Sequence, residues 1–68
     1  MAGNYAVRTF DETGLVVNGG VATAYEAAGT DLANVVPPDF RLIQLIELDR
    51  TVEVDAVKVT FAALLKEV

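Results

Sequence analysis

The stretch TVEVDAVKVTFAALLKEV, residues 51–68, decides the fold that this sequence predicts. Its apolar residues recur at steps of three and four, which is the spacing of one side of a helix. This core seam consists of Val54, Val57, Phe61, Leu64 and Val68. Thr51 is suited to cap the first turn, and AALLKEV has high helix propensity. We therefore predict a C-terminal helix whose seam packs on its own domain.

A second, smaller apolar face lies nearly half a turn away from the seam. It consists of Val52, Ala56, Val59 and Ala63. A surface helix needs only one apolar face, so we predict that this second face is an interface with a partner protein. The alternative is a central helix that its own chain covers on both sides.

A strand interpretation of the same stretch stays open. Many of residues 52–61 are β-branched or aromatic, which is typical of strands. A strand would need a bulge near Asp55 and Ala56, because the valines before and after that point would otherwise face opposite sides. The helix needs no such defect and is preferred. With strands in place of the C-terminal helices, the chain would be a mostly-β small domain.

Residues 39–49, DFRLIQLIELD, form the most apolar local run and also favour a helix. The apolar stripe of this helix consists of Leu42, Ile43, Leu45 and Ile46. Pro38 and Asp39 are suited to a helix start, whereas Gln44 interrupts the strand alternative. The two helical segments meet at residues 49–50. They predict a helical hairpin over about residues 39–67.

The N-terminal half predicts a β-meander over about residues 4–25. YAVRTF, residues 5–10, alternates as a strand does, and residues 11–14 have the composition of a turn. Asn18-Gly19 is a strong hairpin signal, after which VATAY, residues 21–25, is predicted to return as a third strand.

The remaining residues, 26–38, are predicted to connect the meander to the helical hairpin. Pro37-Pro38 is a stiff break within them and the only candidate for a boundary. Neither half is long enough to bury a core alone, so we predict one small α+β domain over residues 1–68.

Composition favours association with other protein chains. A domain of 68 residues buries a small share of its surface and usually needs disulfides, a metal or oligomerisation. The chain has no Cys and no His, 53% of its residues are hydrophobic, and its mean hydropathy is +0.41. Oligomerisation is the remaining way to stabilise so small a domain. We therefore expect the partners to be further copies of the chain, in a homo-oligomer, or other protein subunits.

The net charge of −5, without a basic patch, argues against nucleic acid as a partner, since phosphate neutralisation supplies most non-specific affinity. The sequence shows no signal peptide, and no apolar run is long enough to span a bilayer. The location in the cell stays open between the cytoplasm and an assembled virion.

The sequence contains few side chains that could carry out catalysis. Without His, Cys or Ser, no imidazole-activated nucleophile is available. The acids that cluster in the sequence are Glu47, Asp49, Glu53 and Asp55. Their spacing does not match a calcium loop, and we interpret them as a solvated acidic rim. We therefore predict no catalytic residue, no metal, no cofactor and no small-molecule substrate.

Together these features predict a structural or assembly subunit that acts through apolar interfaces, for example a virion or shell component. The alternative is a small acidic adaptor, inhibitor or antitoxin-like module that docks on one target. Salt distinguishes the two, because charge-steered binding is screened by salt whereas apolar association is not.

Overall fold

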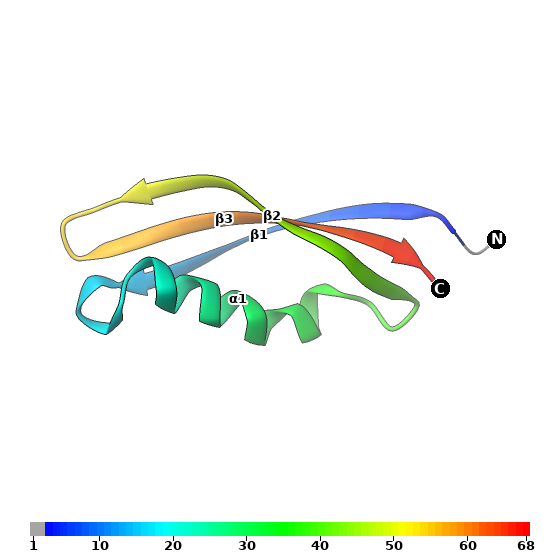
Figure 1. Cartoon of the computed structure of the whole chain (residues 1–68), viewed down its shortest axis with the longest axis horizontal. Coiled ribbons are helices and arrows are strands. Elements are labelled where there is room, and N and C mark those ends of the chain that lie inside the picture. Colours follow the sequence, from blue (N-terminus) through cyan, green and yellow to red (C-terminus); the bar gives the residue numbers. More distant parts are fainter. Residues whose placement is uncertain (1–2) are drawn as a thin grey trace.

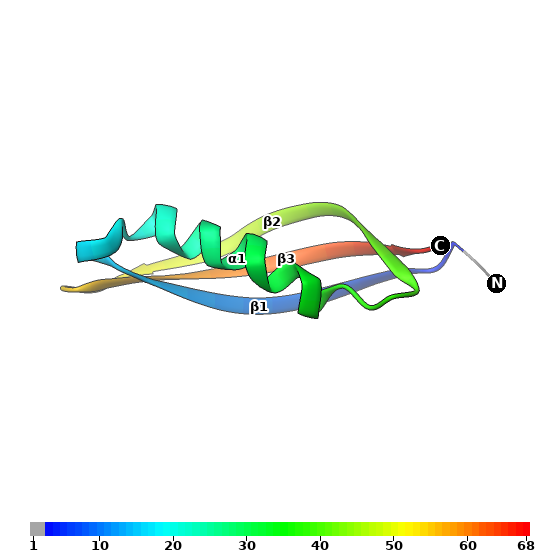
Figure 2. The same cartoon turned by 90° about the horizontal axis from the view of Figure 1, so that it is seen from below.

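A computed structural model describes residues 3–68, which contain three strands and one α-helix. The elements are β1 (Tyr5–Leu15), a 3-10 turn η1 (Val16–Asn18), α1 (Val21–Val35), β2 (Phe40–Val52) and β3 (Ala56–Glu67). The strands form one antiparallel sheet in the order β1-β3-β2, and α1 lies across one face of it (Figures 1 and 2). The predicted α+β class is confirmed.

The C-terminal stretch forms the central strand rather than a helix. β3 pairs with β1 on one side and with β2 on the other over nearly its whole length. Its odd-numbered side chains face the α1 side and are buried; they are Val57, Val59, Phe61, Ala63 and Leu65. The predicted C-terminal helical hairpin is therefore wrong.

The spacing of the seam explains this error. A step of four residues, such as Val57 to Phe61, keeps two side chains on one side of a strand as well as on one side of a helix. The helix propensity of AALLKEV amounts to tenths of a kcal/mol per residue. Pairing on both sides and burial of the β-branched Val57 and Val59 outweigh it.

Bulges in β2 explain why residues 39–49 imitate a helix. The register of β2 against β3 shifts between Leu42 and Gln44 and again between Glu47 and Asp49. Each shift inserts a residue, so side chains on one face of β2 are separated by either two or three positions. At residues 53–55, where the strand alternative needs a bulge, the chain reverses, and the Ala56 carbonyl accepts a bond of 2.8 Å from the Glu53 N–H.

The predicted β-meander is also wrong, although a strand at residues 5–10 is confirmed. β1 continues through residues 11–14, where a turn is expected. The turn at Asn18-Gly19 exists, and Gly19 and Gly20 have φ of 120° and 60°, but it leads into α1 instead of a third strand. The buried side of α1 is Ala24 and Ala28, whose small side chains give a weak apolar pattern.

The core lies between α1 and the middle of β3. Phe61 is fully buried, and its ring stacks on Phe10 with a centroid distance of 5.4 Å. Tyr25 meets the same ring edge-on at 5.0 Å. Ala24 and Ala28 let the helix backbone approach the sheet. The Pro37-Pro38 segment connects α1 to β2, and the Pro37 carbonyl accepts a bond of 3.0 Å from the Phe40 N–H.

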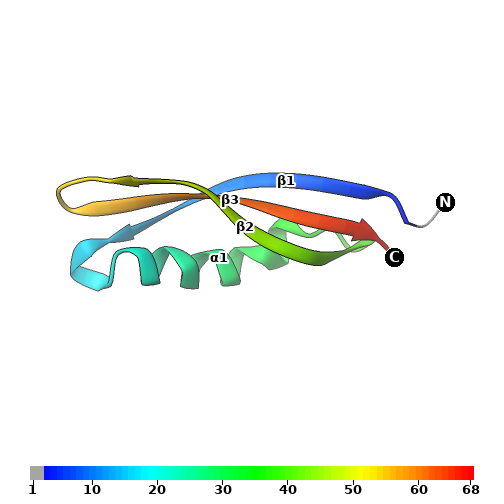
Figure 3. The same cartoon turned by 45° about the horizontal axis from the view of Figure 1, so that its top comes forward.

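The domain is long and thin (Figure 3), with extents of 47 × 18 × 12 Å. Its radius of gyration is 13.3 Å. A compact domain of this length has a radius of gyration of about 11 Å. The elongated shape leaves a large share of the sheet in contact with solvent.

Candidate protein interface

The face of the sheet opposite α1 is covered by no element of residues 3–68, and we call it the open face. The register of the strands places odd-numbered β1 residues and even-numbered β3 residues on it. Five of its apolar members form the open-face patch: Tyr5, Val7, Ile46, Ala62 and Leu64. The side chains of Tyr5, Val7 and Ile46 are 63%, 62% and 40% exposed. Solvated sheet faces are ordinarily polar, so this patch is the strongest candidate for an interface.

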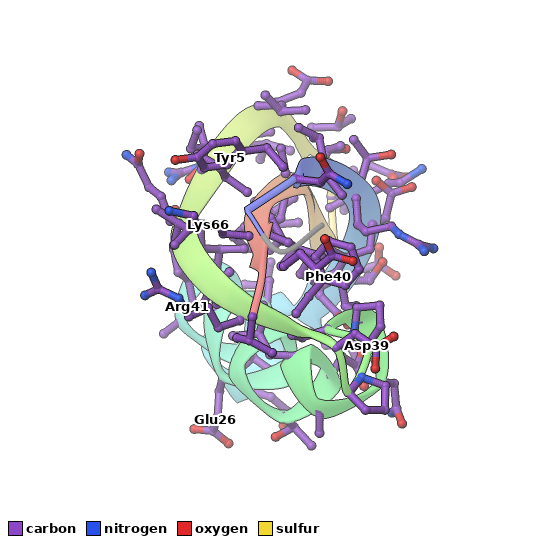
Figure 4. The ribbon with its side chains drawn as sticks, turned by 90° about the vertical axis from the view of Figure 1, so that its right-hand side faces the viewer. Tyr5, Glu26, Asp39, Phe40, Arg41 and Lys66 are labelled. Atoms are coloured by element: carbon purple, nitrogen blue, oxygen red, sulfur yellow. The ribbon has the colours of Figure 1, made fainter. Side chains whose placement is uncertain are left out.

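A cationic row borders the patch near the two chain ends. Tyr5, Lys66 and Arg41 are neighbours across the three strands. Figure 4 shows these three side chains on one side of the sheet and Phe40 on the other. The Lys66 ammonium lies 5.5 Å from the centre of the Tyr5 ring, in a cation–π contact.

A polar group borders the patch at its other end. The Thr60 hydroxyl donates a hydrogen bond of 2.7 Å to Asp11, and the Lys58 ammonium lies 3.4 Å from the same carboxylate. The Thr60 bond, followed by the charge of Lys58, lowers the pKa of Asp11. The open face is therefore mostly apolar in its middle, where Thr9 and Gln44 are its polar members, and charged at both ends.

A separate network joins α1 to β2 on the opposite side of the sheet. Arg50 binds the Glu47 carboxylate through two nitrogens at 2.9 and 2.8 Å, and the Tyr25 hydroxyl donates to the same carboxylate. The Arg50 bonds, followed by that of Tyr25, lower the pKa of Glu47. This network holds α1 over the sheet.

Two carboxyl groups meet where α1 crosses β1. Glu12 faces the helix, and Asp31 of α1 lies beside it. Burial, reinforced by the Asp31 carboxyl, raises the pKa of Glu12 from 4.5 to about 7. The folded chain thus keeps a proton on Glu12 that the unfolded chain releases near pH 4.5.

The Glu12 proton predicts a pH dependence of stability. Between pH 4.5 and 7 the folded state binds more protons than the unfolded state, so the free energy of unfolding falls as the pH rises through this window. Glu12→Gln removes the titrating group, and we expect it to stabilise the dilute protein above pH 7 by about 1 kcal/mol after solvent screening. Urea unfolding at pH 5 and pH 8 measures the change.

Glu26→Gln is the matched control, because Glu26 is exposed and points away from the sheet (Figure 4). We expect this control to keep the wild-type dependence between pH 5 and 8. The lowered pKa values of Asp11 and Glu47 act below this window, since their contribution is lost only as the pH falls towards 4 and lower. An unchanged pH slope in Glu12→Gln would contradict the assignment.

The four residues of the sequence-predicted interface do not share one surface. Val59 and Ala63 are fully buried on the α1 side of β3. Val52 is exposed at the end of β2, and Ala56 is half-buried at the start of β3. The structure therefore brings Val59 and Ala63 into the core and leaves only Val52 and part of Ala56 accessible.

The five residues of the core seam are also separated. Val57 and Phe61 lie in the core, and Leu64 is half-buried on the open face. Val54 and Val68 are exposed, in the β2–β3 turn and at the C-terminus.

The acidic rim is divided as well. Glu47 lies on the α1 side and Asp49 on the open face. Glu53 and Asp55 lie in the exposed β2–β3 turn. Tyr5 and Val7 are not among the four residues of the sequence-predicted interface, although the alternation of residues 5–10 already places them on one side of a strand.

Within residues 3–68, no group of three acidic, His or Cys side chains is arranged to hold a metal ion. The described residues also enclose no pocket. α1 is too short and not apolar enough to cross a membrane, and it is the only α-helix in the described part of the chain.

The fold and its surface define a small two-layer α+β domain with an open, partly apolar sheet face. Comparison with known proteins found no matching family model, no matching curated protein and no matching solved structure.

Proposed function

We propose that this protein is a non-enzymatic assembly subunit that joins other protein subunits through the open face of its sheet. The open-face patch carries the proposal, because its Tyr5, Val7 and Ile46 are exposed apolar side chains on strands that are paired within the sheet. Contiguous apolar surface of this kind marks protein–protein contacts. A virion or shell component is one such subunit.

The small core supports the same proposal. Among the described residues, half of the buried core side chains are alanines: Ala24, Ala28, Ala62 and Ala63. The larger ones are Phe61, Leu65 and two valines. A domain with so few large buried side chains gains stability when a partner covers more of its apolar surface.

Ile46→Lys tests the use of the open face. Ile46 lies opposite Ala62 on β2, within the open-face patch, and a charge there must be desolvated when a partner covers it. We expect the wild-type protein to have a solution mass well above 7.2 kDa at low and high salt, and Ile46→Lys to lower that mass. Light scattering behind a sizing column measures both.

Val54→Lys is the control, since Val54 is fully exposed in the β2–β3 turn, away from the patch. It should keep the wild-type mass, and circular dichroism should show an intact fold in both variants. A wild-type mass that Ile46→Lys does not change would contradict the proposal. Salt-sensitive binding of a monomer to a basic partner would instead favour the acidic adaptor.

A further inference from the structure

The outer edge of β1 presents backbone groups that no other strand of residues 3–68 pairs with, up to Leu15, whose carbonyl accepts a bond of 2.9 Å from the Gly20 N–H. The Asn4 carbonyl accepts a bond of 2.8 Å from the Glu67 N–H, and the Asp55 carbonyl accepts one of 2.9 Å from the Val16 N–H. Between these points the register against β3 runs from Tyr5 to Leu15 without a shift. Even-numbered residues therefore direct their backbone groups to β3, and odd-numbered residues direct theirs outward.

The two edges of the sheet differ in how well they are protected. β2 carries two bulges, which are a common defence against edge-to-edge pairing. β1 has none over its 11 residues. It is the edge that is ready to accept another strand.

We propose that β1 pairs antiparallel with β1 of a second copy, about a two-fold axis at Phe10 that places Arg8 of each copy opposite Glu12 of the other. This inference goes beyond the proposed function, because it uses the edge of the sheet instead of its open face, and it names one partner, a second copy of the chain. The axis runs perpendicular to the sheet, so a continuous sheet forms with both helices on the same face.

The sequence of β1 selects this register. Residues opposite each other in an antiparallel pair lie on the same face, so their side chains must be compatible. An axis at Arg8 would set Arg8 against itself, and an axis at Asp11 or Glu12 would set like acids against each other. An axis at Thr9 would leave Arg8 opposite Phe10. Only the axis at Phe10 pairs opposite charges.

The same register uses the whole strand. Tyr5 and Leu15 are equally far from Phe10, so they lie opposite each other on the open face and the pairing extends to both ends of β1, where the Leu15 carbonyl is already bonded to the Gly20 N–H. Both are exposed in the single chain, at 63% and 48%. The outward backbone groups of odd-numbered residues then meet odd-numbered residues of the second copy, as hydrogen bonding requires.

The outer edge of β1 carries acidic and basic side chains that a second copy of the chain can pair with. Glu12 lies beside Asp31, which gives two carboxyl groups together on the α1 side of β1. Arg8 lies on the same side of β1 and forms no ion pair within residues 3–68. In the new pairing Arg8 and Glu12 occupy non-hydrogen-bonded positions, where side chains of paired strands are closest. Each acid pair thus gains a cation from the other copy.

Charge-reversal variants test this register. Arg8→Glu and Glu12→Arg each place like charges opposite each other twice in a dimer, and we expect each to raise the dimer dissociation constant by about tenfold or more. Mixing the two single variants in equal amounts creates two attractive pairs, so the mixture should regain the wild-type dimer mass. The double variant Arg8→Glu/Glu12→Arg should also dimerise. Sedimentation velocity over a concentration series at pH 8, above the pKa of about 7 of Glu12, measures the wild type and these four samples.

The mixture separates a lost interface from a lost fold, because an unfolded variant is not rescued by mixing. A wild-type monomer at every concentration, or a dimer that neither single variant weakens, would overturn the β1 pairing. If Ile46→Lys lowers the mass and Arg8→Glu does not, the open-face proposal stands without the β1 dimer. If Arg8→Glu alone dissociates the protein, the β1 dimer stands without the open-face proposal.

Discussion

Gly14→Ala is expected to disrupt the junction of β1 and α1 and to destabilise the domain by about 3 kcal/mol, at the upper end of overpacking costs. Gly14 is buried, and a Cβ added to it would lie 1.9 Å from the Gly20 carbonyl oxygen and 2.9 Å from the Ala24 backbone nitrogen. Both atoms belong to backbone at the start of α1, so no flexible side chain can move aside. Relief requires a shift of the helix away from the sheet.

The size of this effect matters because small domains have little stability to lose. Stability of about 0.05–0.15 kcal/mol per residue gives a chain of this length roughly 3–10 kcal/mol in total. We therefore expect Gly14→Ala to remove from about a third to nearly all of the stability of the domain. Urea unfolding followed by far-ultraviolet circular dichroism measures the loss.

Gly29→Ala is the matched control for this experiment. Gly29 lies inside α1, and a Cβ added to it would meet no atom within 4 Å. Alanine is favoured over glycine in a helix by about 0.8–1 kcal/mol, so this variant should be more stable than the wild type. Equal effects of the two substitutions would show that Gly14 does not form the close contact.

Part of this fold could be predicted from the sequence, and part of it could not. The α+β class and the strand at residues 5–10 follow from composition and alternation. The turn at Asn18-Gly19 can also be predicted from the sequence. The element that follows the turn cannot, because a glycine with positive φ can precede either the second strand of a hairpin or a helix. From the sequence, Gly14 is predicted to lie in a turn. In the structure it allows the backbone at the start of α1 to lie close to β1, and no local sequence pattern predicts this contact.

The candidate interface could not be predicted for a related reason. Which side chains are exposed depends on whether a segment is a helix or a strand, because the two have different periodicities. If the wrong one is predicted, buried residues are assigned to the surface and exposed residues to the core. On a helix Val59 belongs to the small outer face, whereas on β3 it alternates with Lys58 and Thr60 and is fully buried. In β2 the bulges break the two-residue period, so Leu42 and Leu45 face the same side three positions apart.

Phe61→Ala is expected to have the largest effect of a core substitution, with a loss of about 3–5 kcal/mol. Phe61 is the largest fully buried side chain in residues 3–68, in the middle of the central strand. Its ring contacts Phe10 of β1 and Tyr25 of α1, so its removal opens a cavity that both layers line. The remaining buried side chains near it include two alanines, which cannot fill the space.

Loss of Phe61 is also expected to loosen the link between α1 and β2. The Tyr25 ring rests edge-on against Phe61, while its hydroxyl donates to Glu47. Near-ultraviolet circular dichroism should therefore lose the signal of fixed tyrosine rings along with the fall in urea midpoint. Val54→Ala, at a fully exposed position, should leave both measurements unchanged. A Phe61→Ala protein with wild-type stability would contradict the placement of the Phe61 ring in the core between α1 and β3.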